Sequence, residues 1–383
     1  MWALAPGIHH LNHGSFGAVL EEAMERQSEW RARFEENPTR FVARDLPSAM
    51  ERAREAVAGF VGADPAGIAP VRNATTGIAS AVRSMEPMLE PGDQLLTTAH
   101  DYNAIRQILD FTGRRTGAEV VVAAVPFPIE APSQVTDAVL DSVTSRTKLA
   151  LIDHITSPTA LVYPIESIVG ALEPEIPVIV DGAHGPGQVS LDLDRLGASW
   201  YTGNLHKWVC APKGSAFLRT RSDRLEMTVP TVISHGYNAP VDEPEDRYAL
   251  LFDWLGTDDF SAWAVIPDVL SLVGGLEAGG WEAVMKHNHE LALDGRRIVA
   301  EAVGTDLPAP DEMVGAMAAI LLHDNPGPDP GGDLSPLMGE LLDKGFATIA
   351  MNWPRWPHQL LRISAHHYNT VADFRSLAEA LRT

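Results

Sequence analysis

Apolar and polar residues follow two different periods along the first 220 residues of the chain. Residues 19–37 carry helix-spaced apolar positions among Glu and Arg, Pro38 follows them, and residues 50–61 repeat this amphipathic pattern. From about residue 68 to 220, further helical patterns, at 77–88 and 104–112, alternate with short apolar runs. These runs are 94–98, 119–125, 149–152, 177–180 and 215–218. Such alternation predicts crossover connections and a mostly parallel sheet, in which ligands bind beyond the carboxyl ends of the strands.

The second half of the chain has a different pattern. Residues 238–246, rich in Pro and acidic residues, predict a surface loop, and residues 260–276 predict one long apolar helix that connects two domains. Beyond it, helical patterns (281–303, 334–344) and short strands (316–322, 359–364) flank a Gly- and Pro-rich stretch, 324–333, which is a lid or a plain connector. We therefore expect an N-terminal arm (1–18), a large domain (19–260), a connecting helix (261–280) and a small α+β domain (281–383).

Composition narrows the classes of function. Hydrophobic residues make up 45% of the 383 residues and charged residues 21%, which is typical of a globular protein of about two domains. The 51 acidic and 29 basic residues give a net charge of -22, which argues against a nucleic-acid or anionic-membrane footprint. Cys210 is the single cysteine and excludes an intramolecular disulfide. We see no targeting segment and expect a cytoplasmic protein.

Three stretches place chemically useful side chains where strands end or helices begin. The buried run 177–180 leads into Asp181 and then His184. The stretch Gly203-Asn-Leu-His206-Lys207 follows, and Asn73-Ala-Thr75-Thr76-Gly77 opens a helix much earlier. Each residue by itself has an ordinary structural explanation, such as a turn carboxylate, a core histidine, a surface lysine or a helix cap. Their combination at strand ends makes a purely structural role for the whole set improbable.

Pyridoxal phosphate is a ligand that would use all of these groups. Its ring nitrogen must stay protonated to accept electrons, and Asp181 can keep it so. Lys207 can supply a neutral amine for a Schiff base. Thr75 and Thr76 at a helix N-terminus can bind the phosphate, and Tyr102 can stack on the ring.

The order of these motifs resembles the class V, isopenicillin-N-epimerase-like branch of the fold type I pyridoxal-phosphate enzymes. The similarity runs from His10-Leu-Asn-His-Gly-Ser-Phe-Gly17 to Leu361-Arg-Ile-Ser-Ala-His366. It implies an α/β, aspartate-aminotransferase-like fold: a large domain with a mostly parallel, seven-stranded type of sheet and a small C-terminal α+β domain. Lys207 would then hold the cofactor, Asp181 would contact the pyridine nitrogen, and His184 would contact the phenolic oxygen. The resemblance further implies Thr156 or Ser157 near that edge, phosphate binding by Thr75, Thr76 and His206, and stacking by Tyr102.

The same resemblance implies residues for the substrate and for a partner. Arg362 would bind the substrate α-carboxylate, since an Arg fork fits a planar carboxylate. Asn12, His13 and Arg40 fall in segments that line the substrate entrance in such relatives. Gly256-Thr257 would complete the phosphate site of a second subunit, which implies a homodimer with shared active sites. The chain departs from the cysteine desulfurases in one respect: residues 324–333 contain no cysteine, which argues against persulfide chemistry.

The reaction at Cα or Cβ of the amino-acid substrate stays open. We favour C–S β-elimination from a cysteine S-conjugate, in sulfur or natural-product metabolism including antibiotic biosynthesis, because it requires only Lys207 as base and a good leaving group. Epimerisation needs a second acid, for which His13, Tyr237 and His367 are candidates, and transamination or decarboxylation-linked deamination are further alternatives. Two other classes of protein are alternatives. One is a metal-dependent hydrolase that uses Asp153-His154, Asp181-x-x-His184 or His9-x-x-x-His13 as ligands, and the other is a non-catalytic binding protein.

Overall fold

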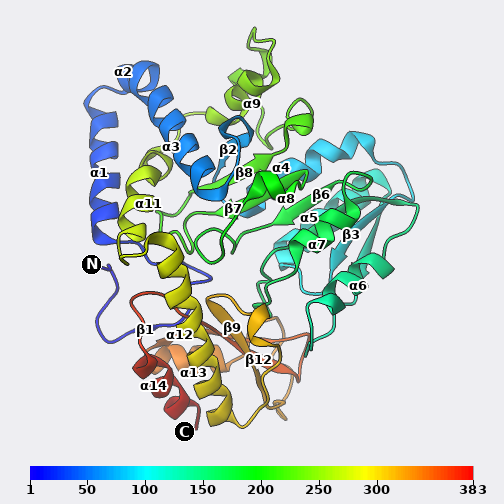
Figure 1. Ribbon diagram of the computed structural model, residues 1–383, viewed down its shortest axis with the longest axis vertical. Coiled ribbons are helices and arrows are strands. Elements are labelled where there is room, and N and C mark those ends of the chain that lie inside the picture. The colour runs from blue at the N-terminus through cyan, green and yellow to red at the C-terminus, as the bar shows by residue number, and fades with distance from the viewer. Residues whose placement is uncertain (383) are drawn as a thin grey trace.

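The main sheet of the protein has seven strands in the order β2-β8-β7-β6-β5-β3-β4. The computed structural model describes residues 1–382 (Figure 1). Strands β7, β6, β5, β3 and β4 run parallel, whereas β8 is antiparallel to both of its neighbours. The mostly parallel sheet is therefore confirmed. The strands are β2 (Ile68–Val71), β3 (Gln94–Thr98), β4 (Glu119–Ala123), β5 (Thr147–Asp153), β6 (Val178–Asp181), β7 (Trp200–Asn204) and β8 (Ala216–Thr220).

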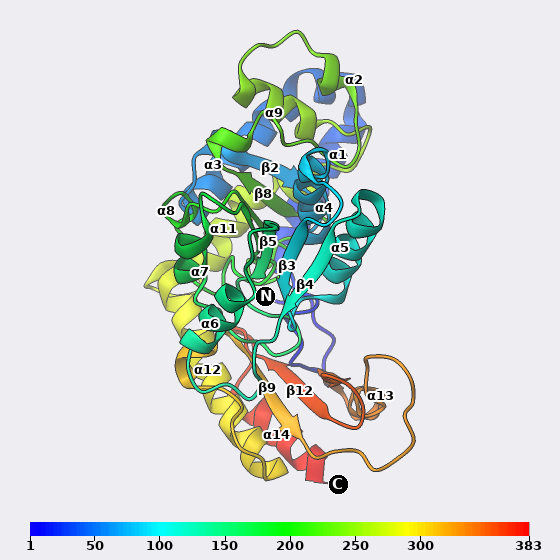
Figure 2. The ribbon, with the colours of Figure 1, turned by 90° about the vertical axis from the view of Figure 1, so that its right-hand side faces the viewer.

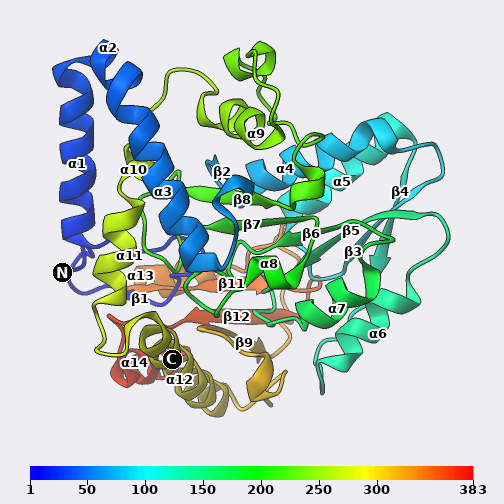
Figure 3. The same cartoon turned by 45° about the horizontal axis from the view of Figure 1, so that its top comes forward.

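Helices cover both faces of this sheet, as Figure 3 shows. Along β5, Leu149 and Leu151 pack into one hydrophobic cluster, and Ala150 and Ile152 pack into the cluster on the opposite face. Strands that are buried on both faces have continuous apolar sequences rather than alternating ones. One face is covered by α4 (Ala74–Met85), α5 (Asn103–Thr116) and α9 (Pro244–Asp253), and the other by α3 (Leu46–Val61), α6 (Ser133–Asp141), α7 (Ile165–Leu172) and α11 (Ile266–Gly274).

A smaller antiparallel sheet, in the order β11-β12-β9, forms the C-terminal part of the protein (Figure 2). A two-strand parallel pairing between β1 (His9–His10) and β10 (Phe346–Ala347) joins the N-terminal arm to this part. The other elements here are β9 (Met317–Leu322), β11 (Ile349–Asn352), β12 (Gln359–Ser364), α12 (Gly280–Val303), α13 (Leu337–Asp343) and α14 (Val371–Arg382). The domain boundaries given above stay predictions.

The observed elements differ from the predicted ones in several places, and β2 and β7 were not among the predicted runs. The single helix expected over 260–276 is wrong: α10 (Ser261–Ala264) ends before α11 begins. Pro267 explains the break, because its ring would clash with the carbonyl four residues earlier in a continuous helix. The loop expected to reach residue 246 is shorter, since α9 begins at Pro244, a favoured first position. Similarly, Pro38 follows α1 (Glu21–Glu36) but opens α2 (Pro38–Arg40).

The remaining described elements do not alter this architecture. A five-residue π-helical turn (Phe41–Asp45) joins α2 to α3, and α8 (Leu193–Leu196) is a single turn before β7. Among residues 1–382, no helix has both the length and the apolar character needed to cross a bilayer.

Candidate active site

A pocket of about 330 Å³ lies where β5, β6 and β7 end. This is the edge of a parallel sheet at which ligands bind. Seven of the site residues predicted from the sequence line it together: Thr75, Tyr102, Ser157, Asp181, His184, His206 and Lys207. The structure also adds residues that the sequence analysis missed, among them Ser15, Phe16, Asn204 and Lys213. Asn204 ends β7, a strand that was not among the predicted runs, so inspection of the predicted strand ends could not have found it.

Lys207 lines this pocket, with its amine against an imidazole. Its Nζ is 3.1 Å from Nε2 of His184. Burial, followed by the nearby Arg362 charge, lowers the pKa of Lys207 from 10.5 to about 7, and the Asp181 carboxylate opposes this shift. The amine is therefore available in its neutral, nucleophilic form near neutral pH.

This shift predicts the pH dependence of cofactor uptake. Because only the neutral amine forms a Schiff base, the rate for the apoprotein with pyridoxal phosphate should rise as pH increases through about 7 and level off about one unit higher. A lysine with an ordinary pKa would instead give a rate that climbs about tenfold per pH unit up to about 10. Stopped-flow absorbance at a series of pH values measures this, and a continued rise above pH 9 would contradict it.

His184 has a defined tautomer. The indole Nε1–H of Trp208 donates to Nδ1 of His184 at 3.3 Å, so the imidazole hydrogen is on Nε2. Burial, followed by the charges of Lys207 and Arg362, lowers the pKa of His184 well below 6.5, and the ring is neutral. Nε2–H therefore points toward Lys207 as a donor, which suits a phenolic oxygen.

Two buried carboxyl groups lie side by side in the lining of the pocket. Asp181 ends β6 and pairs in register with Asp153 of β5, and both line the pocket. Oδ1 of Asp181 accepts the Ala183 N–H at 2.9 Å. Burial raises the pKa of Asp181, whereas that N–H and the Lys207 charge lower it. Oδ2 of Asp153 has no hydrogen-bond partner among the described residues, and burial followed by the Asp181 charge raises the pKa of Asp153 well above its ordinary value.

One end of the pocket is built from the start of α4. Asn73 caps this helix by accepting the Thr76 N–H at 2.9 Å, and Asn204 accepts the Ala74 N–H at 2.8 Å. Thr75 lines the pocket. His206 donates from Nδ1 to the Ser215 carbonyl at 2.8 Å, which fixes its ring. A helix N-terminus with a hydroxyl and an imidazole beside it fits a phosphate group.

Arg362 approaches the other end of the pocket from β12. Its side chain is almost fully buried and contacts no carboxylate among the described residues. It donates to the Ser157 carbonyl at 2.5 Å and to the Ser15 hydroxyl at 2.6 Å, and its Nε–H has no partner in the described part of the chain. Burial lowers the pKa of Arg362 to about 10, so it stays charged at neutral pH. A buried guanidinium without a counter-ion fits an anionic ligand.

The other predicted site residues lie outside the pocket lining. Thr156 is buried and shares a hydrogen bond with Thr159. Thr76 and Thr257 line a separate groove of about 410 Å³. Asn12 is 3.4 Å from Arg362, Arg40 is exposed on α2, and His13 is buried behind Lys207. The groups of the hydrolase alternative do not converge: among residues 1–382, three or more His, Cys, Asp or Glu donors come within 4.8 Å only at His13, Cys210 and His366.

Comparison with known proteins identifies the family. The family model described as aminotransferase class-V matches residues 15–377. The chain belongs to this family. This class-V chain is 32% identical to "Putative L-cysteine desulfhydrase 1" of Oryza sativa subsp. japonica. The aligned region covers 98% of this chain and 83% of that relative. It is 31% identical to isopenicillin N epimerase of Streptomyces clavuligerus, over 99% of the chain and 95% of that enzyme.

Solved structures show the same fold. A mutant of C-DES with glycine covalently linked to its pyridoxal-phosphate cofactor superposes with a TM-score of 0.81 at 19% identity, covering 98% of this chain and 97% of that one. A second structure, of "the cystine C-S lyase C-DES" with its product cysteine persulfide, gives 0.79 at 20% identity, over 98% of each chain. The predictions of a class V family, a fold type I architecture and pyridoxal phosphate as cofactor are confirmed. The protein is a pyridoxal-phosphate enzyme, and its residues fit that group: a capped helix terminus, a buried carboxylate and a half-buried lysine.

Proposed function

We propose that the enzyme cleaves the C–S bond of a cysteine S-conjugate by β-elimination, in sulfur or natural-product metabolism. The observation that carries this proposal is a pocket lined by Lys207, whose amine is available as base, with Arg362 bonded to the lining residues Ser15 and Ser157. Among residues 1–382, Arg362 has no counter-ion. None of the three acids considered for epimerisation lines this pocket: His13 is buried behind it, Tyr237 is on the exposed surface, and His367 contacts Glu277. The desulfhydrase and C-S lyase among the similar proteins support the same choice.

Residues of this chain have separate roles in this proposal. Lys207 would hold the cofactor, Asp181 would keep the ring nitrogen protonated, and His184 would donate to the phenolic oxygen. Thr75, His206 and the start of α4 would bind the phosphate, with Tyr102 over the ring. Bound pyridoxal phosphate supplies an electron sink for negative charge that develops at the substrate Cα.

The proton transfer then follows from the geometry. Arg362 would bind the substrate carboxylate and orient the Cα–H bond toward Lys207, whose neutral amine takes the proton. Loss of that proton allows the Cβ–S bond to break, and the sulfur leaves as a thiolate with the bonding electron pair. Hydrolysis of the remaining three-carbon unit gives pyruvate and ammonia.

A direct assay separates elimination from epimerisation. The holoenzyme is incubated with L-cysteine, L-cystine and S-alkyl-L-cysteines in deuterated water, and pyruvate, deuterium at Cα and enantiomeric purity are measured. Pyruvate formation supports the proposal. Recovery of a deuterated, epimerised amino acid without pyruvate would instead establish the alternative that the Streptomyces relative favours.

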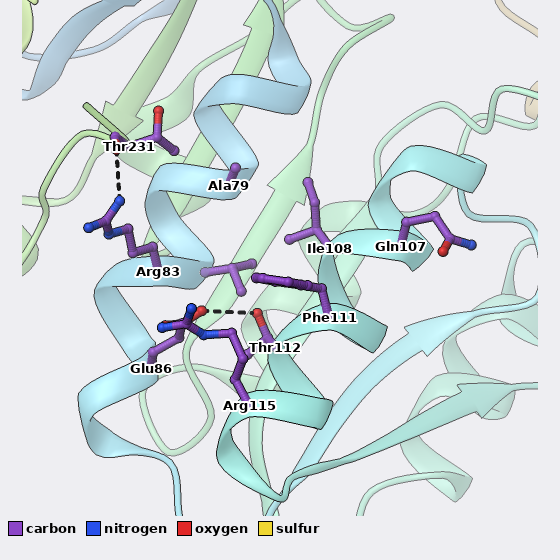
Figure 4. Close-up of a pocket in the computed structure, with 10 residues that line it drawn as sticks. Ala79, Arg83, Glu86, Gln107, Ile108, Phe111, Thr112, Arg115 and Thr231 are labelled. Carbon is purple, nitrogen blue, oxygen red and sulfur yellow. Dashed lines mark hydrogen bonds and ion pairs between the residues drawn. The ribbon is translucent and has the colours of Figure 1, made fainter.

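We also propose that the enzyme is a homodimer with shared active sites. The groove that contains Thr257 also contains Thr76 and Val232, beside the helix terminus of the phosphate end. Figure 4 shows a second pocket between α4 and α5, lined by Ile108 and Phe111 of α5, with Arg83 of α4 donating to the Thr231 carbonyl. Val232, Ile233 and Phe111 are 50%, 44% and 53% exposed. An exposed apolar surface of this kind, next to the groove that contains Thr257, is typical of a protein–protein interface.

A charged residue in this surface should separate the subunits. We expect Val232→Asp to yield monomers at concentrations where the native protein is a dimer, because a buried, unpaired carboxylate disfavours association. The monomer should also retain pyridoxal phosphate less well. Light scattering with absorbance measures both. Leu140→Asp, at an exposed apolar position on α6, is the matched control, and a monomeric native protein would contradict the proposal.

A further inference from the structure

His13 contacts the main chain of Lys207 rather than the pocket. Its ring is completely buried, and its Nε2 is 2.9 Å from the Lys207 carbonyl oxygen. Its Nδ1 is 2.9 Å from the Tyr368 hydroxyl. A carbonyl oxygen only accepts, so the imidazole hydrogen is on Nε2 and Tyr368 donates to Nδ1. The chain of donors therefore runs from Tyr368 through His13 to the backbone of Lys207.

The turn that follows Lys207 has an unfavourable conformation. Cys210 has φ of 63°, in the left-handed region that residues other than glycine rarely adopt. Its N–H donates to the same Lys207 carbonyl at 2.9 Å, and its Sγ is 3.3 Å from Nε2 of His366. Such conformations persist where the surroundings hold them and are concentrated at functional sites. Here the surroundings are a cluster that contains the buried rings of His13 and His366 and the half-buried Tyr368.

The segment that carries His13 also reaches the substrate end of the site. A Cβ on Gly17 would lie 2.5 Å from the Lys207 carbonyl oxygen, so the arm packs directly on this turn. Ser15, between these two residues, accepts from Arg362 at 2.6 Å. The arm thus contacts the backbone of Lys207 and the guanidinium of Arg362 within five residues, from His13 to Gly17.

We propose that His13 is a positioning residue that fixes the backbone of Lys207, and that Tyr368 orients it for this role. This inference rests on the proposed role of Lys207 in holding the cofactor. It differs from the substrate contact that the family resemblance implied for His13. The arm would thereby set the position of the lysine relative to Arg362, so that one segment aligns the base with the carboxylate-binding group.

Metal binding is the competing explanation of this cluster. The donor atoms of His13, Cys210 and His366 lie within 4.8 Å of one another. However, the His13 and His366 rings stack, with centroids 4.1 Å apart and planes at 19°. Their in-plane lone pairs therefore do not converge well on one ion, and Nε2–H of His13 is already engaged by Lys207. Hydrogen bonding accounts for the arrangement better.

Three variants test the positioning role. His13→Phe removes both hydrogen bonds but keeps a ring, His13→Gln restores an N–H donor, and Tyr368→Phe removes only the hydroxyl. The readouts are the rate at which each apoprotein forms the Schiff base with pyridoxal phosphate, the mass-mapped lysine after borohydride reduction, and the melting temperature. We expect His13→Phe to form the Schiff base about fivefold more slowly, because it loses the neutral hydrogen bond to the Lys207 carbonyl. His13→Gln should recover most of the native rate, and Tyr368→Phe should have no added effect in the His13→Phe background.

The outcomes distinguish this inference from the proposed function. Adduct on a lysine other than Lys207 in the native protein would overturn the proposed function itself. With native adduct on Lys207, equal rates for His13→Phe and His13→Gln would overturn only the positioning role. If His13→Phe melts below the assay temperature, the test rests on Tyr368→Phe alone. A rate of Schiff-base formation equal to that of the native protein would then overturn the inference. Stoichiometric bound metal that Cys210→Ala loses would establish the metal site instead.

Discussion

Lys207→Ala should abolish covalent cofactor attachment and lower turnover by at least about 10³- to 10⁴-fold, the upper range for loss of a general base. Lys207 is the buried amine whose pKa is lowered to about 7, and its Nζ contacts His184. Pyridoxal phosphate should still bind without a covalent bond, because Asp181 and the start of α4 are unchanged. Absorbance, mass mapping after borohydride reduction and steady-state kinetics measure these effects.

Lys213 offers a matched control for this experiment. It also lines the pocket, but its Nζ donates to the Gly17 carbonyl at 2.5 Å, and burial lowers its pKa. Lys213→Ala should keep the reducible adduct on Lys207. Retention of the adduct by Lys207→Ala together with its loss in Lys213→Ala would show that the chemistry has been placed on the wrong lysine.

Arg362→Leu should lower kcat/KM for amino-acid substrates by about 30- to 4000-fold. Removing one partner of a buried charged hydrogen-bonded pair costs about 2–5 kcal/mol, and about 1.4 kcal/mol corresponds to a factor of ten. The guanidinium is well placed for a carboxylate because it is buried and charged and, within residues 1–382, forms hydrogen bonds only with Ser157, Ser15 and Asn12. Arg362→Lys keeps the charge without the planar fork and should have an intermediate effect.

A substrate pair separates binding of the carboxylate from general damage to the site. Cysteine S-conjugates and the corresponding amines that lack the carboxyl group are compared in the native enzyme and in Arg362→Leu. The native enzyme should strongly prefer the carboxylates, and the variant should lose most of this preference. Equal losses for both substrates would mean that Arg362 supports the structure of the pocket and does not bind the carboxylate.

Part of the chemistry at the strand ends could be predicted because its residues lie close to a single buried strand. Asp181 ends β6 and His184 follows it, whereas β7, the strand before Lys207, was not among the predicted runs. Parallel strands bring their carboxyl ends to one edge, so these residues had to meet once the sheet was identified. The order of the motifs then indicated the family and the cofactor.

Contacts between distant parts of the chain could not be read in this way. Nothing in the pattern around His13 indicates that its ring faces the carbonyl of Lys207, 194 residues away, or that Ser15 meets Arg362. The sequence by itself determined the parallel sheet, the pocket edge and the lysine, because hydrophobic period and strand ends are local properties. Only the tertiary structure decided how the arm and the small sheet close the site, because those placements depend on packing between segments that share no local pattern.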